Sequence, residues 1–540
     1  MQAIYDYIVV GAGSAGCAVA ARLAQDKQTS VLLLEAGPAD KNIWIHIPIG
    51  YGKTMFNPQL NWQFKSEPEP FLNNRQIYQP RGRTLGGSSS INGLVYIRGQ
   101  SQDFDAWEAL GNEGWGWRDV LPYFKRSEGN ERGESALHGG SGPLSVSNIR
   151  GKHELVEAFI GAANEIGVPR TTDFNGAVQE GAGYFQLTTR NGRRWSTARG
   201  YLKPARKRGN VAVVANALTT RLLFEGRRAV GVEYIKDGGK HVARANAEVI
   251  VSGGAFNSPQ LLQLSGVGPA DLLQQHGIAV IADMKGVGAD LQDHYQARFN
   301  YRGTTRNTIN DMMGSVVGRV AAGLRYALLR KGFLTIGAGY AGGFFKTDPS
   351  LPTPDVQFHF ILFSADSVGQ KLHPWPGFLT SVCQLRPESR GFVRIKSADP
   401  AQAPAIQPRY LTAQVDRDVM VAGMKLIRRV MGQPAMARYI DEELMPGAKV
   451  QTDAELLEFA RQKGTTVFHP TSTCRMGSDV TAVVDERLRV HGFQGLRVAD
   501  ASIMPTVVSG NTNAACVMIG EKASDMILED ATAKPAAKAA

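Results

Sequence analysis

The chain has 540 residues, of which 43% are hydrophobic and 20% are charged, and it contains 60 glycines. This composition excludes disordered and fibrous chains and fits a globular protein with a large buried core, in roughly three or four domains by length. The net charge of +11 is compatible with nucleic acid or an anionic membrane surface as a partner. Because the basic residues are scattered outside the stretch 199–210 and no common nucleic-acid-binding motif occurs, we expect no nucleic-acid partner.

The cysteines and the N-terminus bear on the compartment. The cysteines are far apart in sequence and form no CxxC pair: Cys17, Cys383, Cys474 and Cys516. We therefore expect no disulfide scaffold and a reducing compartment. The N-terminus lacks a basic region followed by an apolar stretch, and no apolar run reaches the ~18 residues of a membrane helix. The expected location is the cytoplasm, with peripheral attachment to the inner membrane face left open.

A dinucleotide-binding pattern opens the chain. Residues 5–10 are apolar and β-prone, and a G-x-G-x-x-G pattern follows at 11–16. An alanine-rich segment to about Ala24 predicts a helix, and residues 30–35 predict a second strand that ends at Glu35. Glycines let the backbone approach a pyrophosphate, whose charge the helix N-terminus favours, and Glu35 can accept hydrogen bonds from ribose hydroxyls. This context predicts a working dinucleotide site rather than a tight turn without a ligand.

A second literal match to the glycine pattern lies at residues 337–342. The prolines within residues 349–354 prevent a crossover helix, so we interpret this match as a glycine-rich turn. Flavoenzymes that also bind NAD often carry two working patterns. A single working pattern therefore favours one dinucleotide, such as FAD itself.

Two further stretches are rich in glycine. Residues 82–99, GRTLGGSSSINGLVYIRG, follow Arg81 and combine paired glycines with serines, which can bring backbone amides against a phosphate or an aromatic ring. Apolar residues follow at once, which favours a buried loop over a surface loop. Residues 254–268, GAFNSPQLLQLSGVG, follow an apolar stretch and predict a strand, a turn and a short helix that ends at a glycine.

In these stretches the sequence resembles the glucose–methanol–choline (GMC) family of FAD-dependent oxidoreductases. Both glycine-rich stretches match the two signature patterns of the family, and the pattern at 11–16 matches its start. Further similar stretches are residues 114–128, 191–202 and 496–525. The resemblance spans almost the whole chain and is nearest to the bacterial FAD-dependent alcohol dehydrogenases and the choline dehydrogenase-like members.

The resemblance implies an α/β fold, α+β overall, with two domains. A Rossmann-type FAD-binding domain is built from discontinuous segments, which we place at 1–155, 205–295 and 465–530. The substrate domain takes the remainder, 156–204 and 296–464, with an antiparallel sheet flanked by helices. Residues 354–363 and 377–397 read as strands of that sheet. The low-complexity tail at 531–540 is expected to be disordered.

A histidine near the C-terminus, His469 in FHPTSTCRMG, admits several roles. A zinc site would show several Cys or His ligands, and no HExxH or CxxC motif occurs, so no metal is expected. A common α/β serine hydrolase would show GxSxG after a strand, and we find none. A lone histidine is otherwise most often a hydrogen-bonded core residue. Pro470 biases His469 to extended backbone, which suits a side chain that projects from a strand end or a loop.

The resemblance assigns a role to His469. In the family, a histidine before this proline lies over the flavin ring as the catalytic base, and its partner follows a DxSxxPT stretch. Here that stretch is residues 500–506, and the matching partner is Asn511. An alcohol must lose its hydroxyl proton as its carbon gives a hydride to flavin N5. Histidine accepts that proton near neutral pH, and the Asn511 amide can donate to the substrate oxygen. The spacing also offers Asn513, which aligns against the flavin instead.

The resemblance also implies how the cofactor is held. Some members link FAD covalently through a histidine at the position of Ile91, so we expect noncovalent FAD. Cys474 reads as a small buried residue rather than a reactive thiol, because only Arg475 is cationic beside it. The expected FAD-binding residues are Gly11, Gly13, Ser14, Ala15, Gly16, Glu35, Ala36, Arg81, Gly86, Gly87, Ser88, Asn92, Gly93, Val95, Thr219, Asp500, Ala501, Thr512 and Asn513.

We expect FAD-dependent oxidation of a primary alcohol, aliphatic or aromatic, to the aldehyde, with oxygen or a quinone or carrier protein as electron acceptor. Choline is the first alternative substrate. Its trimethylammonium group needs a carboxylate or an aromatic cage, for which Asp366, Trp375 and Tyr340 lie in the expected substrate domain. A hydroxynitrile lyase-like enzyme and a non-catalytic flavin protein are alternatives of other classes. The pair of His469 and Asn511 speaks against the last of these.

Overall fold

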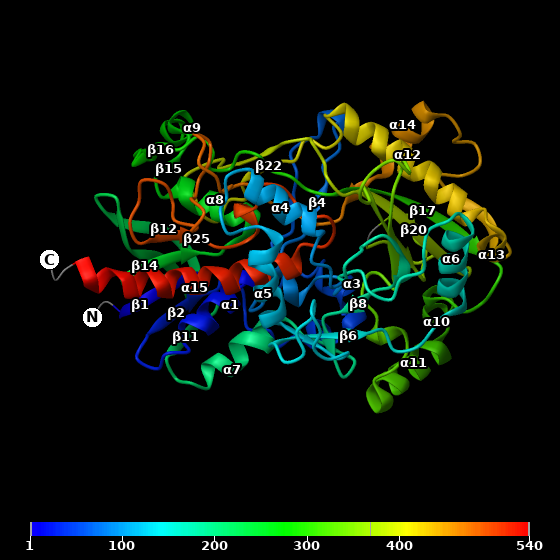
Figure 1. Cartoon of the computed structure of the whole chain (residues 1–540), viewed down its shortest axis with the longest axis horizontal. Coiled ribbons are helices and arrows are strands. Elements are labelled where there is room, and N and C mark those ends of the chain that lie inside the picture. Colours follow the sequence, from blue (N-terminus) through cyan, green and yellow to red (C-terminus); the bar gives the residue numbers. More distant parts are fainter. Residues whose placement is uncertain (1–2, 368, 538–540) are drawn as a thin grey trace.

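The computed structural model describes residues 3–367 and 369–537, and within them two seven-stranded sheets organise the chain (Figure 1). The first sheet has the order β11-β2-β1-β14-β13-β12, with β25 beside β14. The parallel strands are β1, β2, β11, β14 and β25, whereas β12, β13 and β14 form an antiparallel meander. The bounds are β1 Ala3–Val10, β2 Val31–Leu34, β11 Val211–Val214, β12 Leu218–Glu225, β13 Arg228–Lys236, β14 Gly239–Val251 and β25 Leu496–Val498.

The start of the first sheet forms as its sequence predicts. Residues 7–10 of β1 and all of β2 are buried, as expected for parallel strands covered on both faces. Helix α1 (Ser14–Leu23) begins directly after the glycine turn. Strand, turn, helix and second strand therefore follow one another in the predicted order, and the glycine turn lies at the carboxyl end of β1.

The last helix of the chain packs on the first. Helix α15 (Asn513–Ala537) lies beside α1 and α5 (Trp117–Ser127) (Figure 1). Glu521 of α15 is buried and accepts hydrogen bonds at 2.7 Å from Arg22 of α1 and from Arg126 of α5. At Gly520 a Cβ atom would lie 2.6 Å from the Ala15 carbonyl oxygen, so only glycine permits this close approach of the two helices.

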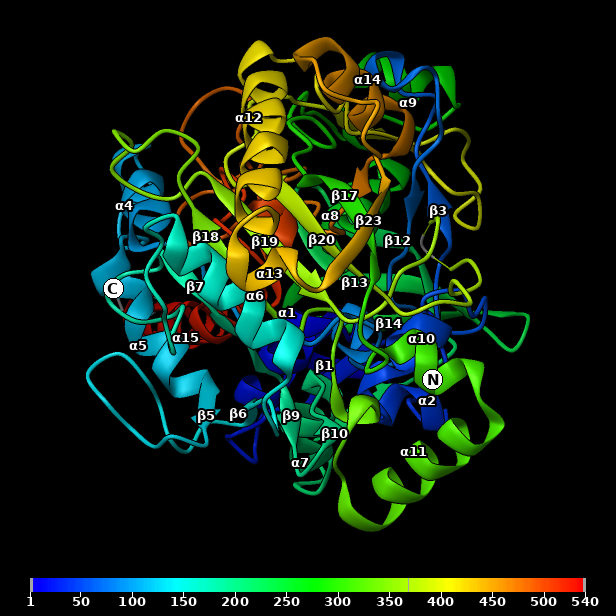
Figure 2. The same cartoon turned by 90° about the vertical axis from the view of Figure 1, so that its right-hand side faces the viewer.

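The second sheet is antiparallel throughout, with the order β23-β17-β20-β19-β18-β7, and β24 pairs with β17. Helix α12 (Gln414–Met431) packs on β20, and α6 (Glu154–Glu165) packs on α12 (Figure 2). Apolar side chains of these strands and helices form one buried core. The bounds are β7 Gly181–Tyr184, β17 Tyr295–Gly303, β18 Ala341–Phe345, β19 Val356–Ile361, β20 Gly377–Gln384, β23 Ile440–Met445 and β24 Thr465–Thr466.

Shorter elements connect and cover the sheets. The remaining α-helices are α2 Ile43–His46, α3 Tyr51–Thr54, α4 Ser101–Ala109, α7 Lys203–Arg206, α8 Gly254–Leu264, α9 Ala270–Gln275, α10 Ile309–Gly314, α11 Val316–Leu329, α13 Pro434–Ala437 and α14 Asp453–Lys463. The short strands are β3 Phe64–Lys65, β4 Tyr78–Gln79, β5 Glu128–Asn130, β6 Leu144–Asn148, β8 Gln186–Leu187, β9 Thr189–Arg190, β10 Arg193–Arg194, β15 Val267–Gly268, β16 Ala282–Asp283, β21 Phe392–Arg394 and β22 Ala405–Gln407. None of the described helices is both long enough and apolar enough to span a bilayer.

The predicted fold class is confirmed, and the structure corrects three local expectations. Residues 377–397 give β20, which joins the second sheet, and β21, which pairs with β22 instead, because Pro387 interrupts the ladder between them. The expected turn at 337–342 runs into β18, where Gly342 leaves room for the Phe185 ring. Helix α15 continues through residues 531–537, in keeping with the high helix propensity of alanine. Residues 538–540 of the expected disordered tail lie outside the described residues, and the expected domain boundaries stay a prediction.

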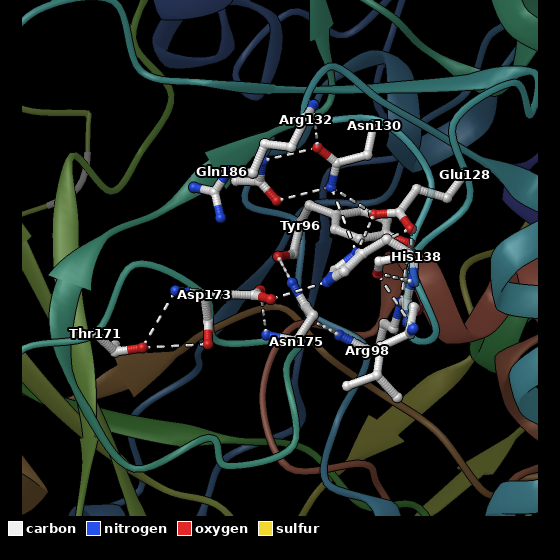
Figure 3. Close-up of polar contacts among 12 residues, drawn as sticks. Tyr96, Arg98, Glu128, Asn130, Arg132, His138, Thr171, Asp173, Asn175 and Gln186 are labelled. Atoms are coloured by element: carbon white, nitrogen blue, oxygen red, sulfur yellow. Dashed lines mark hydrogen bonds and ion pairs between the residues drawn. The ribbon is translucent and has the colours of Figure 1, made fainter.

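A buried polar network fixes residues 96–98, near the end of the glycine-rich stretch 82–99 (Figure 3). The Arg98 guanidinium is buried and pairs with Glu128, which also pairs with His138 Nδ1 at 3.1 Å. On its other side, His138 Nε2 lies 2.8 Å from Asp173 Oδ2. The Arg98 backbone N–H donates to Asn175 Oδ1 at 2.9 Å. The network thus joins residues 96–98 to two distant loops and holds the preceding glycine-rich loop in place.

The charge on His138 stabilises this network. Its hydrogen bonds to Asp173 and Glu128 raise the pKa of His138 from 6.5 to about 9. The contribution to folding stability is therefore complete below pH 6.5 and is lost as the pH rises through about 9. The pKa values of Glu128 and Asp173 are lowered despite their burial, because both carboxylates are hydrogen-bonded to His138, so their contribution is lost only when the pH falls into the acid range.

Replacing His138 with glutamine removes the cation between the two carboxylates. We expect H138Q to lower the free energy of unfolding by about 1–3 kcal/mol near pH 6, and this difference from wild type to shrink above about pH 9. Urea unfolding followed by tryptophan fluorescence at both pH values measures it. H241Q, which changes an exposed histidine, is the matched control. A difference of equal size at both pH values would contradict the assignment.

Candidate active site

A cavity of about 990 Å³ connects the two sheets. At one end it is lined by residues at the carboxyl ends of β1 and β2, including Gly11 and Glu35. At the other end it is lined by strand residues of the second sheet, including His359 and Leu379. Ligands of open parallel sheets bind at the carboxyl ends of the strands, so the cavity begins where a dinucleotide is expected.

The backbone of the first glycine turn forms one wall of the cavity. Gly11 has a φ of +100°, and a Cβ atom on it would lie 2.4 Å from the Ser252 carbonyl oxygen, so no other residue fits there. Ser14, at the start of α1, lines the cavity and donates its hydroxyl to Asn513 Oδ1 at 2.8 Å. The amino ends of α1 and α15 therefore meet at this wall, where their unpaired N–H groups favour an anionic ligand.

Glu35 lies at the end of β2, as predicted. Its carboxylate accepts hydrogen bonds from the backbone N–H groups of Ala12 at 3.0 Å and Gly37 at 2.9 Å. Burial raises the pKa of this carboxyl from 4.5 to about 7. The acid thus fixes the glycine turn, and its remaining acceptor capacity faces the cavity, where it suits ribose hydroxyls.

The glycine-rich loop at residues 86–93 packs on the glycine turn at residues 11–16. It is held by a buried arginine that the sequence analysis did not single out. Gly87 has a φ of +50°, and a Cβ atom on it would lie 2.7 Å from the Gly13 Cα. Arg194 Nη1 donates to Asn92 Oδ1 at 2.6 Å, and its Nη2 donates to the Asn92 carbonyl at 2.7 Å. Burial lowers the pKa of Arg194 to about 9. Among the described residues, Arg194 donates to backbone carbonyl oxygens and to the Asn92 amide oxygen, so it positions the loop.

Most predicted residues line this cavity, and two do not. The lining includes Gly11, Gly13, Ser14, Ala15, Glu35, Ala36, Arg81, Gly87, Ser88, Asn92, Gly93, Val95, Thr219, Asp500, Ala501, Thr512 and Asn513, together with His469 and Asn511. Gly16 and Gly86 lie behind the lining. A Cβ atom on Gly16 would lie 2.0 Å from the Gly11 carbonyl oxygen, and the Gly86 N–H donates to the Ala12 carbonyl at 2.7 Å. Both therefore shape the backbone of the site instead.

His469 follows β24 and points into the cavity. Phe468 before it has a φ of +71°, which is uncommon for a residue with a side chain and turns the backbone toward the cavity. The His469 backbone N–H donates to Asp293 Oδ1 at 2.7 Å. Asp293 Oδ2 accepts from the hydroxyls of Thr466 and Tyr410, each at 2.5 Å. A buried, fully bonded carboxylate thus fixes the backbone that carries His469.

The hydrogen bonds around His469 determine which of its nitrogens carries the proton. His294 Nε2 lies 2.9 Å from the Leu385 carbonyl oxygen, which can only accept, so that nitrogen carries a hydrogen. In the neutral ring His294 Nδ1 is then an acceptor, and its neighbour at 3.0 Å, His469 Nδ1, must donate. The lone pair of His469 is left on Nε2, where Asn511 Nδ2 donates to it at 3.2 Å. Gln357 Nε2 donates to Asn511 Oδ1 at 3.2 Å and sets the direction of that amide.

All three histidines of this region are held neutral. Burial lowers the pKa of His294 and of His359 from 6.5 to about 4. Burial, with His294, His359 and Arg81 nearby, lowers the pKa of His469 well below its ordinary value. A neutral imidazole with its lone pair facing a cavity can accept a proton from a ligand, and the adjacent amide can donate to that ligand.

Sequence reasoning missed His294, Asp293, Gln357 and His359. A signal was present for the last two, since Gln357 and His359 are two apart in a predicted strand and so share one of its faces. Polar residues at such spacing within an apolar strand indicate a lined cavity rather than a core. Asp293 and His294 gave no comparable signal, because their partners are distant in sequence.

Other candidates lie elsewhere. Asp366 and Trp375 line a separate cavity, and Asp366 pairs with His373 at 3.1 Å. Tyr340 donates its hydroxyl to the Gly151 carbonyl at 3.2 Å and packs in the core of the second sheet. These three residues therefore do not converge on the cavity that holds His469. Cys474 is fully buried, and burial raises the pKa of its thiol. No group of potential metal ligands occurs in the part of the chain that the structure describes.

Comparison with known proteins shows the family to which the chain belongs. Profiles described as GMC oxidoreductase match residues 5–296 and 387–520, and the chain belongs to this family. It is 44% identical to an alcohol dehydrogenase [acceptor] from Pseudomonas putida, over 97% of this chain and 96% of that protein. It is 44% identical to a mitochondrial choline dehydrogenase from Mus musculus, over 97% of this chain and 89% of that protein. An FAD-dependent oxidoreductase from Chaetomium thermophilum superposes with a TM-score of 0.90 at 27% identity, over 98% of this chain and 100% of that one.

The contact between the two glycine loops can be tested by cofactor content. In G87A the added methyl group forces Gly87 and Gly13 apart, and we expect the affinity for FAD to fall about tenfold or more, a loss of about 1.4 kcal/mol or more. The ratio of flavin to protein absorbance, followed by titration of the flavin-free protein with FAD, measures the loss. G133A is the control, because Gly133 has a similar left-handed φ of +90° but no atom within 4 Å of an added Cβ. Equal flavin content in the two variants would contradict the packing argument.

Proposed function

We propose that the protein oxidises an uncharged primary alcohol to the aldehyde, with FAD as a noncovalently bound cofactor. The observation that carries the proposal is the pair formed by His469 Nε2 and Asn511 Nδ2, 3.2 Å apart, at the wall of a cavity that also holds the dinucleotide turn. Membership of the GMC oxidoreductase family supports a redox reaction of the substrate held by this pair.

The residues present fit FAD. The glycine walls at Gly11 and Gly87 leave no room for side chains, and Glu35 faces the ribose position. The Thr219 hydroxyl lines the cavity, is buried, and has no partner among the described residues, so a bound nucleotide would satisfy it. Ile91 lines the cavity with an aliphatic side chain that cannot form a bond to the ring, which supports noncovalent attachment. When bound, the flavin supplies the acceptor for the hydride.

His469 and Asn511 would have different roles at the hydroxyl group of the substrate. A substrate oxygen between them donates its proton to the Nε2 lone pair of His469 and accepts a hydrogen bond from Asn511 Nδ2. Donation from the amide stabilises the negative charge that develops on the oxygen as the proton leaves. Because His294 accepts from Nδ1 of His469, the imidazole can take the proton at Nε2 without changing its orientation.

The lining of the cavity beyond His469 favours an apolar, uncharged substrate. This part is lined mainly by Ile309, Met312, Ile361, Phe363, Leu372 and Leu379. Among the described lining residues the carboxylates are Glu35 and Asp500, and both are hydrogen-bonded at the dinucleotide end. Arg298 lines the wall near His359. A quaternary ammonium group would meet the Arg298 guanidinium there and no carboxylate. The lining also includes the aromatic rings of Trp44, Tyr51 and Phe56, so the preference for an alkanol or an aromatic alcohol over choline rests on the charge balance.

The experiment that tests the proposal is anaerobic mixing of the flavin-loaded protein with alkanols of increasing length, benzyl alcohol and choline. We expect the alkanols or benzyl alcohol to bleach the flavin, and choline to do so at least about tenfold more slowly. H469A should slow the bleaching by about 10²–10⁴-fold and N511A by about 10²–10³-fold, without loss of bound FAD. Admission of air then reports the acceptor, since rapid return of colour indicates oxygen. Absence of bleaching by every alcohol would overturn the proposal and favour a lyase-like activity.

His294 acts on the reaction through His469, and its replacement tests the proton assignment. In H294F no acceptor faces His469 Nδ1, so the proton can shift to Nε2, and we expect the rate of flavin reduction to fall about 10²-fold. H294Q, whose amide oxygen can accept from Nδ1, should recover part of the rate. In wild type the rate should rise with pH through a value below 6.5, where His469 loses its proton, and stay level above it. Wild-type rates and pH profile in H294F would contradict a positioning role.

A further inference from the structure

Helix α11 exposes an apolar face. Val317 and Leu328 are 77% and 79% exposed, and the exposed large apolar side chains of residues 313–329 are Met313, Val316, Val317, Val320, Leu324, Leu328 and Leu329. Every other exposed large apolar side chain of the described chain stands alone in its stretch of sequence. A surface helix normally turns its apolar side inward, and scattered single apolar residues need no explanation, but a continuous exposed face does.

The exposed apolar side chains of α11 lie on one face of the helix. At about 100° per residue, Val316, Val320, Leu324 and Ala327 fall on one side of the helix, with Val317 and Leu328 beside them. Tyr326 lies on the opposite side and is buried. The exposed side thus consists of aliphatic residues alone.

Basic residues border the exposed face. Arg325 lies at one margin of the apolar side, and Arg330 and Lys331 follow the end of the helix. Arg319 falls beside Tyr326 on the opposite side and lines the cavity. No aspartate or glutamate occurs from residue 312 to residue 347. The nearest preceding carboxylate, Asp311, is occupied in capping α10. The charged side chains next to the apolar face are therefore all positive. This arrangement is typical neither of a protein core nor of an ordinary solvated surface.

The shape of this region limits what can cover the face. Helix α11 packs against α10 and η5 (Phe333–Thr335) and stands at the periphery of the molecule in both views (Figures 1 and 2). A protruding aliphatic ridge with basic side chains at one margin and at its end matches a fluid bilayer, in which apolar side chains enter the acyl boundary and basic groups stay at anionic headgroups. We propose that α11 docks the protein on the surface of an anionic lipid bilayer, lying in the plane of the interface.

Docking by α11 would bring lipid close to the active-site cavity. The inner side of α10 and α11 lines that cavity through Met312, Ala322, Gly323 and Tyr326. An alcohol dissolved in the bilayer would then lie one helix away from His469. This part of the inference rests on the proposed function and deepens it, because it selects alcohols that partition into lipid. The docking itself depends on no activity, so its test is separate.

The test is co-sedimentation of the flavin-loaded protein with vesicles of phosphatidylcholine, with and without phosphatidylglycerol. We expect the wild type to bind the anionic vesicles. The triple variant V317S/L324Q/L328Q should lose binding by about tenfold or more, because it removes the apolar anchor. R325Q/K331Q should weaken binding to the anionic vesicles about tenfold and leave binding to neutral vesicles unchanged. All of these side chains are exposed, so the variants should unfold at the wild-type temperature.

Matched controls separate the face from general effects. L110Q/V178S/V480S removes three exposed apolar side chains elsewhere, and K27Q/K449Q removes two exposed charges elsewhere; both should bind vesicles as wild type does. Equal binding by the triple variant and its control would overturn the proposal. Failure of the wild type to bind either kind of vesicle would also overturn the proposal. Self-association that the triple variant abolishes, measured by sedimentation equilibrium without vesicles, would overturn it as well and assign the face to a second copy of the chain.

Discussion

The Leu385 carbonyl oxygen, just beyond the end of β20, sets the direction of the hydrogen bonds that reach the proposed base. A carbonyl can only accept, so it fixes the hydrogen on His294 Nε2, and each donor along the series is then determined in turn. Because His294 is fully buried, its hydrogen bonds to Leu385 and His469 are shielded from bulk solvent. The orientation of a single peptide group in the second sheet thus leaves a lone pair on His469 at the wall of the cavity.

The two sheets contribute different chemistry to one cavity. The first sheet supplies backbone: glycines whose lack of a side chain admits a ligand, and helix ends whose N–H groups favour negative charge. The second sheet supplies side chains, because its antiparallel strands direct alternate residues such as His359 and Ile361 toward the cavity. His469 comes from the segment after β24, which pairs with β17. The pair of His469 and Asn511 is therefore held at the junction, and neither sheet could form it alone.

Local patterns predicted the start of the first sheet, and distant contacts limited the rest. The strand, glycine turn, helix and acidic residue of residues 5–35 are consecutive, so their sequence order carries their arrangement. His469 and Asn511 were inferred from the resemblance to a family rather than from spacing. His294 was missed because its contact with His469 depends on the pairing of β17 with β24, which no local pattern encodes. Residues 377–397 read as strands of one sheet from their apolar pattern, whereas in the structure Pro387 lies between β20 and β21, which join different sheets.

The packing of α15 on α1 has a consequence for the order of biosynthesis. Ser14 bonds Asn513, and Arg22 bonds Glu521, so the dinucleotide wall is completed by contacts between residues 499 positions apart. A nascent chain leaves the ribosome from its N-terminus, and its first strands and glycine turn emerge long before the helix that closes over them. The flavin pocket can therefore be completed only after synthesis of nearly the whole chain. We therefore expect stable cofactor binding only late in synthesis, once α15 can pack on the helix that follows the glycine turn.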